Sequence, residues 1–110
     1  MDLDADLLEH CLGKQEPSSS LLKTGAFPNG WVELYLGLLD QAEKKWGTET
    51  AAPRKAVAAI HFASMYLSIR YQAWKGFNRR NNPITDAALC QVRTSSELWL
   101  LGCIRDRSQL

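Results

Sequence analysis

The segment from about residue 50 to residue 75 constrains the fold more than any other part of the chain. On a helical wheel its polar side chains form one narrow stripe, and most of its other side chains are apolar. A helix that is apolar over so wide an arc has to be covered from at least two directions. We therefore predict that this segment is the central helix of an all-α fold. The stripe consists of Arg54, His61, Ser64, Ser68, Gln72 and Lys75.

Three other segments also have the spacing of amphipathic helices. Apolar residues recur at intervals of three and four in residues 3–12, 31–46 and 84–105. The last segment is interpreted as one continuous helix, although the capping-box sequence at residues 94–97 leaves two short helices as an alternative. No segment shows the strict alternation of a β-strand. The sequence thus predicts a small helical bundle of three long amphipathic helices and a short N-terminal helix.

The remaining stretch, residues 14–30, contains prolines, glycines and three serines, which oppose a continuous helix. We predict an irregular connector there. At 110 residues the chain has the length of one domain with one core. Residues 1–110 are therefore interpreted as a single helical-bundle domain.

Charge and cysteine usage bear on partners and compartment. A formal net charge of +1 gives no global attraction to nucleic acid or to an anionic membrane. The three cysteines sit at apolar helical positions without metal-type spacing, so we predict buried, unpaired thiols and no metal site. No motif for a cofactor is found, and the acidic N-terminus is unlike a targeting peptide. We expect a cytoplasmic protein without cofactor and without membrane contact.

Within the polar stripe, Arg54 and His61 lie two helical turns apart, about 10.5 Å along the axis. This spacing resembles the R-x4-6-H motif of HEPN ribonucleases, all-α proteins that dimerise so that two such motifs meet at one RNA site. The resemblance implies that His61 acts in acid/base or orienting work near the scissile phosphate and that Arg54 holds that phosphate. The other interpretation is a solvated stripe on a structural helix.

A second candidate site is the segment after the central helix, where Lys75, Arg79 and Arg80 alternate with aromatic and amide side chains. Such a mixture is typical of single-stranded nucleic-acid sites. The same cations would also stabilise the carbonyl end of the preceding helix through its dipole. Both interpretations are consistent with the residues.

Arg70 falls in the middle of the apolar arc of the central helix. A buried guanidinium needs a partner. We predict that Glu97 or Glu33 supplies it, with a ligand carboxylate or phosphate as the functional alternative.

We expect the helices of residues 31–46 and 84–105 to cover the two flanks of the central helix. This packing leaves some apolar side chains uncovered, which suggests an interface. Leu36 falls on the polar side of its helix, and Leu98 and Leu101 fall on the far side of theirs. Exposed apolar patches of this kind mark association sites. The favoured hypothesis is a non-enzymatic interaction protein that forms a homodimer or binds a protein partner. In the competing account the N-terminal helix and the connector cover this surface, and the alternative function is a HEPN-like ribonuclease or RNA-binding protein.

Overall fold

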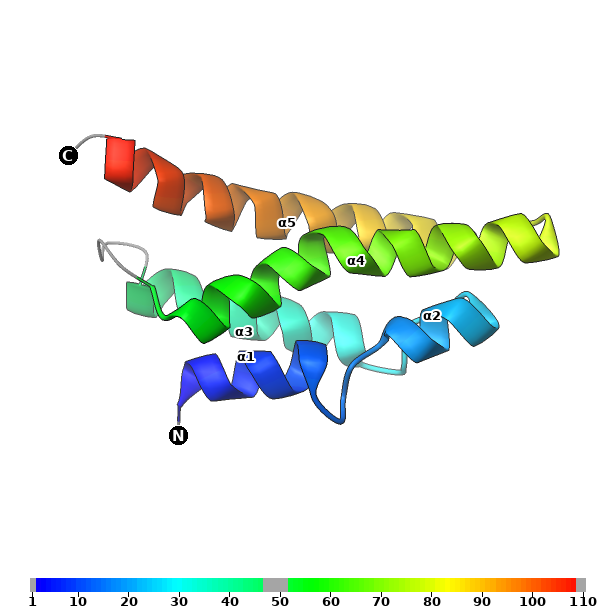
Figure 1. Ribbon diagram of the computed structural model, residues 1–110, viewed down its shortest axis with the longest axis horizontal. Coiled ribbons are helices and arrows are strands. Elements are labelled where there is room, and N and C mark those ends of the chain that lie inside the picture. The colour runs from blue at the N-terminus through cyan, green and yellow to red at the C-terminus, as the bar shows by residue number, and fades with distance from the viewer. Residues whose placement is uncertain (1, 47–51, 109–110) are drawn as a thin grey trace.

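The computed structural model describes the backbone of residues 2–46 and 52–108, and side chains as far as Leu101. Within these residues the chain forms helices and no strands, which confirms the predicted all-α class. Figure 1 shows the arrangement. The helices are α1 (Leu3–Leu12), α2 (Ser18–Thr24), α3 (Trp31–Trp46), α4 (Arg54–Asn78) and α5 (Pro83–Ser108).

The helices occupy four positions around one core. Helices α1 and α2 follow one another along α4, the first beside its N-terminal half and the second beside its C-terminal half (Figure 1). Helix α5 packs on the other flank of α4, and α3 packs on α5 and α1. Helices α3 and α4 therefore lie diagonally opposite and do not pack on each other. We expected both sequence neighbours, α3 and α5, to cover the central helix α4. This prediction is wrong for α3.

Helix α4 keeps its central role because it packs on α1, α2 and α5. Part of its apolar arc, however, is exposed, although the sequence interpretation expected that arc to be covered. The side chains of Met65 and Ile69 are 55% and 59% exposed, although their position on the wheel favoured burial. Within the polar stripe, Ser64 is buried and its hydroxyl donates to the carbonyl of His61 at 2.8 Å. The inward residues are Ala56, Ala59, Ile60, Ala63, Leu67, Tyr71 and Trp74.

The connector prediction for residues 14–30 is wrong in part, because the segment contains α2. The Glu16 carboxylate precedes this helix and accepts hydrogen bonds from the backbone N–H groups of Ser18 and Ser19 and from the Ser18 hydroxyl. Burial of Glu16 raises the pKa of its carboxyl, but these hydrogen bonds outweigh burial and hold that pKa below its ordinary value. Gly25 ends α2 in the left-handed conformation, with φ 68°. The serines that suggested a loop thus form a capped helix start.

The boundaries around the α4–α5 turn also differ from the predictions. Helix α4 begins at Arg54 and continues to Asn78, past the lysine where the pattern seemed to end. Thr85 is of a residue type that commonly caps helices, but Asn82 caps α5: its side-chain oxygen accepts from the N–H groups of Ile84 and Thr85, at 3.2 and 3.4 Å. Pro83 is the first helical residue, a position that needs no N–H. Helix α5 is continuous, so the alternative of two short helices does not apply.

Two pairs of polar side chains tie the helices together inside the core. His10 of α1 stacks on Trp31 of α3, with ring centroids 4.5 Å apart. The His10 Nε2–H donates to the Trp31 carbonyl, and the Trp31 indole N–H donates to the His10 carbonyl, both at 3.0 Å. Burial lowers the pKa of His10, and the hydrogen bond to Trp31 offsets this in part. The second pair joins α3 to α5: the Tyr35 hydroxyl lies 2.6 Å from the Ser96 hydroxyl, which donates to the Val92 carbonyl.

A junction of α2, α4 and α5 closes the other end of the bundle. The Gly25 carbonyl accepts from the Thr85 hydroxyl at 2.6 Å and from the Asn82 amide at 3.1 Å. The Tyr71 hydroxyl donates to the Asn82 carbonyl and accepts from the Asn82 N–H. Trp74 packs so closely over Gly25 that a Cβ there would overlap its ring. These contacts fix the direction in which α5 leaves the turn.

Candidate interaction site

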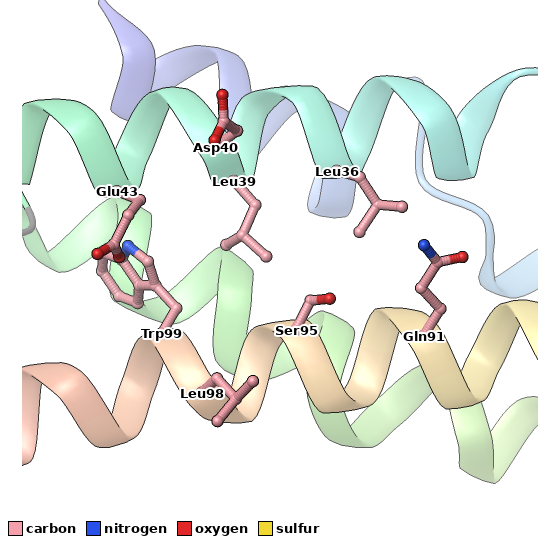
Figure 2. A pocket seen from close by; sticks show the side chains of 8 residues that line it. All are labelled: Leu36, Leu39, Asp40, Glu43, Gln91, Ser95, Leu98 and Trp99. Atoms are coloured by element: carbon pink, nitrogen blue, oxygen red, sulfur yellow. The ribbon is translucent and has the colours of Figure 1, made fainter.

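Helices α3 and α5 enclose an open cleft of about 510 Å³, which we call the α3–α5 cleft (Figure 2). Leu36 and Leu39 point from α3 toward α5, while Gln91 and Ser95 point from α5 toward α3 (Figure 2). The cleft therefore lies on the surface between two helices that pack directly on each other. Its lining residues are Leu36, Leu39, Asp40, Glu43, Gln91, Ser95, Leu98 and Trp99.

The floor of the cleft is apolar and belongs to the core. Leu39 and Trp99 are buried in the core cluster, and the partly buried Leu36 packs against that cluster. Leu98 lies at the edge with 65% of its side chain exposed. The structure thus brings together Leu36 and Leu98, two of the three residues predicted as interface candidates. Leu101, the third, is exposed one turn farther along α5 and does not line the cleft.

The α3 wall of the cleft is acidic. Asp40 and Glu43 line it, and among the described lining residues there is no lysine or arginine. Lys44 forms an ion pair with Asp40 at 3.1 Å, and both side chains are largely exposed. An exposed pair of this kind contributes little to stability. The wall therefore combines carboxylates with an apolar floor.

A second cleft of about 510 Å³ continues the first toward the α4–α5 turn, and Gln91 lines both. Phe27, Val32 and Ile84 contribute its apolar lining, and Glu33 adds another carboxylate. Five of the α5 residues that line the two clefts recur at intervals of four and three, the spacing by which a helix presents a seam to a partner helix. These five are Ile84, Ala88, Gln91, Ser95 and Leu98, and Thr85, Ala87 and Trp99 line the clefts beside them.

Arg54 and His61, the residues of the HEPN-like spacing, are both exposed on α4. Neither side chain has a hydrogen-bond or ion-pair partner within the part of the chain that the structure describes. Neither residue lines the α3–α5 cleft or its continuation. The positions of these two side chains do not test the RNA-directed hypothesis, which stays a prediction.

The basic residues at the C-terminal end of α4 flank one exposed aromatic residue in the sequence, and we call Lys75, Phe77, Arg79 and Arg80 the basic corner. Phe77 is 88% exposed. The Lys75 ammonium lies 5.5 Å from the centre of the Tyr71 ring, and the Arg80 guanidinium lies 5.4 Å from the centre of the Trp74 ring. Arg79 ends α4 in the left-handed conformation with φ 51°. The cations thus lie at the carbonyl end of α4, where the helix dipole favours them.

Arg70 does not form the predicted ion pair. Glu97 pairs instead with Arg93 on its own helix at 3.1 Å, and Glu33 lies at the second cleft. The Arg70 guanidinium lies 4.8 Å from the centre of the Tyr66 ring, and its buried Nε has no hydrogen-bond partner in the described residues. An aromatic face therefore takes the place of the expected carboxylate.

Cysteines differ in environment more than the sequence suggested. Cys11 is buried, and burial raises the pKa of its thiol to about 12. Cys90, predicted to be buried, is exposed beside a polar cleft between α4 and α5. Cys103 lies outside the residues whose side chains are described. Among the described residues no group of three or more potential metal ligands is found.

In the described part of the chain, no helix combines the length and the apolar character needed to cross a bilayer. Comparison of the chain with protein-family models, with curated proteins and with solved structures finds no match. Function is therefore argued from the clefts and surfaces alone.

Proposed function

We propose that this chain is a small non-enzymatic helical protein that acts by association, forming a homodimer through the α3–α5 cleft. The observation that carries the proposal is the cleft itself: an open surface with a buried apolar floor, edged by the exposed Leu98. Exposed apolar patches with polar rims mark interaction sites. The unpaired thiols of Cys11 and Cys90 favour a reducing compartment such as the cytoplasm.

A two-fold dimer is the commonest form of a homo-oligomer, because each copy then uses the same surface and the assembly closes. The cleft and its continuation together provide an elongated apolar surface along α3 and α5. Ile84, 82% exposed, and Leu98 lie at its two ends. Association would remove these side chains from water, at about 25 cal/mol for each Å² of apolar surface.

Light scattering over a concentration series tests the proposal. We expect the mass of the wild-type chain to approach twice 12.4 kDa at micromolar concentrations. Leu98→Lys should restore the monomer mass, whereas Met65→Lys, at an exposed apolar position on α4, should not. A wild-type mass that stays near 12.4 kDa throughout the series would contradict the proposal.

The alternative is an RNA-directed ribonuclease or RNA-binding protein that uses Arg54, His61 and the cations of the basic corner. It is supported by the exposure of both stripe residues on one helix. A metal-independent ribonuclease assay on the wild-type chain, with His61→Ala as the control, tests the enzymatic form. The salt dependence of RNA binding tests the basic corner, because phosphate contacts weaken as salt rises.

A further inference from the structure

We infer that the segment that fills the α3–α5 cleft is the basic corner of a second copy of this chain. The inference rests on the proposed self-association and adds which element of the partner copy enters the cleft. Three observations support it: the charge of the α3–α5 cleft, the composition and rigidity of the basic corner, and the positions of cleft and corner along the bundle.

Charge argues against packing one cleft directly on another. Glu43 and Glu33 line the two clefts without an ion-pair partner in the described residues, and Asp40 lines the first cleft while paired with Lys44. No lysine or arginine is among the described lining residues. A two-fold contact of cleft on cleft would bring the carboxylates of both copies into one interface from which water is withdrawn. Like charges placed together in an interface oppose association strongly. The cleft instead suits an apolar side chain that is flanked by cations.

The basic corner has this composition. Phe77 is the most exposed of the large apolar side chains in the described residues, and residues 74–82 contain no acid. An exposed phenylalanine next to two arginines matches the aromatic and arginine residues that dominate binding energy at interfaces. Phe77 would lie on Leu36, Leu98 and Trp99, with Arg79 and Arg80 toward Asp40 and Glu43.

The corner is also a rigid projection and not a loose loop. The Arg79 N–H donates to the Lys75 carbonyl at 2.8 Å, and the Asn78 amide donates to the Trp74 carbonyl at 2.9 Å. Because these contacts hold the turn in place, little ordering of the backbone is needed when it binds.

The backbone conformation of Arg79 indicates that its side chain contacts another molecule. Its φ of 51° is in the left-handed region, which glycine adopts without the steric cost that an arginine meets there. The side chain of Arg79 forms no hydrogen bond or ion pair within the described residues. A cation is thus held where the backbone of a single copy would favour glycine. Contact of that cation with a carboxylate of a second copy explains the arrangement.

The positions of corner and cleft require two copies. The corner lies at the end of the bundle where α4 meets α5 (Figure 1), whereas Trp99 lies 16 residues into α5, about 24 Å from its start. A chain cannot fill its own cleft with its own corner. In an antiparallel two-fold dimer each copy places its corner in the cleft of the other, so that two equal contacts form and the assembly closes.

The first test compares dissociation constants for variants of the corner, measured by sedimentation equilibrium. Phe77→Ser and Arg79→Gly should each weaken the dimer by about tenfold or more. Arg79→Gly relieves the left-handed strain, so its thermal unfolding temperature, measured at a concentration where all variants are monomeric, should equal or exceed that of the wild type. Weaker association of a chain that is at least as stable cannot result from misfolding.

The second test exchanges charges across the contact. Glu43→Lys alone and Arg79→Glu alone should each weaken the dimer, because two like charges then meet at both contacts. An equimolar mixture of the two variants should form a heterodimer with a dissociation constant close to that of the wild type, since every contact again joins opposite charges.

Different outcomes separate the two proposals. A wild-type chain that is monomeric at all concentrations overturns both. A wild-type dimer that Leu98→Lys disrupts, but that Phe77→Ser and Arg79→Gly leave unchanged, keeps the proposed function and overturns the basic corner as the occupant. A mixture of the charge variants that stays as weak as its components also overturns the inference.

Discussion

Gly25 is the position where a single added carbon should change stability most clearly. The residue ends α2 with φ 68°, and its carbonyl receives hydrogen bonds from Asn82 and Thr85. A Cβ at this position would overlap the ring of Trp74. The substitution Gly25→Ala therefore introduces two separate costs, one in the backbone and one in the packing.

The magnitude follows from adding these costs. A non-glycine residue in the left-handed region costs about 1 to 2 kcal/mol. Forcing an extra carbon into a packed site costs about 1 to 3 kcal/mol, and here the two hydrogen bonds oppose a shift of the backbone away from Trp74. We expect Gly25→Ala to lower the free energy of unfolding by about 2 to 5 kcal/mol, a large part of the total for a domain of this size.

Gly30→Ala is the matched control. Gly30 also has a positive φ, 75°, but no atom lies within 4 Å of a Cβ built there. This variant should show only the backbone cost, about 1 to 2 kcal/mol. Urea unfolding followed by far-UV circular dichroism, at one protein concentration for all variants, measures both. If Gly25→Ala costs no more than Gly30→Ala, the close contact with Trp74 does not matter and the reasoning is refuted.

Three further predictions concern His10, the Tyr35–Ser96 pair and the cysteines. Because burial lowers the pKa of His10 below its ordinary 6.5, the unfolded chain binds more protons than the folded one below that pH. The stability that His10 contributes is therefore complete above pH 6.5 and falls as the pH drops toward the folded-state pKa. The urea concentration at the midpoint of unfolding should fall in this way for the wild type and not for His10→Gln. Ser96→Ala should lower the free energy of unfolding by about 1 to 3 kcal/mol, because it leaves the buried Tyr35 hydroxyl without its partner. Tyr35→Phe removes that hydroxyl and should cost only about 1 kcal/mol. Equal losses for the two variants in thermal unfolding would argue against this difference. In the folded protein a thiol reagent should label Cys90 fast and Cys11 only at the rate of unfolding. Mass spectrometry measures the labelling of each cysteine, and equal labelling would show that Cys11 is accessible.

The candidate site was only partly predictable from the sequence. Leu36 and Leu98 were each predicted to be exposed apolar residues, because periodicity shows which residues lie outside the apolar arc of their own helix. Periodicity does not show that the two residues face one cleft, since that depends on α3 packing beside α5. The basic residues and their neighbouring aromatic side chains were recognised as a candidate site from the sequence, but the continuation of α4 through Phe77 was not.

The sequence by itself determined where the long helices lie and which face of each is apolar. Trp31, Tyr35, Leu38, Ala42 and Trp46 recur at helical spacing in α3, and all are buried. Regular spacing specifies a face because backbone geometry fixes 3.6 residues in each turn. Local capping chemistry was present in the sequence too, although the role of Glu16 before α2 was not recognised.

Only the tertiary structure decided which faces meet. An apolar face on α4 can be covered by any helix that offers a complementary one, and its periodicity does not distinguish α3 from the pair α1 and α2. The choice depends on long-range contacts: His10 with Trp31 ties α1 to α3, and the Gly25 carbonyl with Thr85 and Asn82 ties α2 to the start of α5. These contacts join residues 21 to 60 positions apart, beyond the reach of any local pattern. The diagonal placement of α3 and α4, and with it the α3–α5 cleft, therefore exists only in the folded chain.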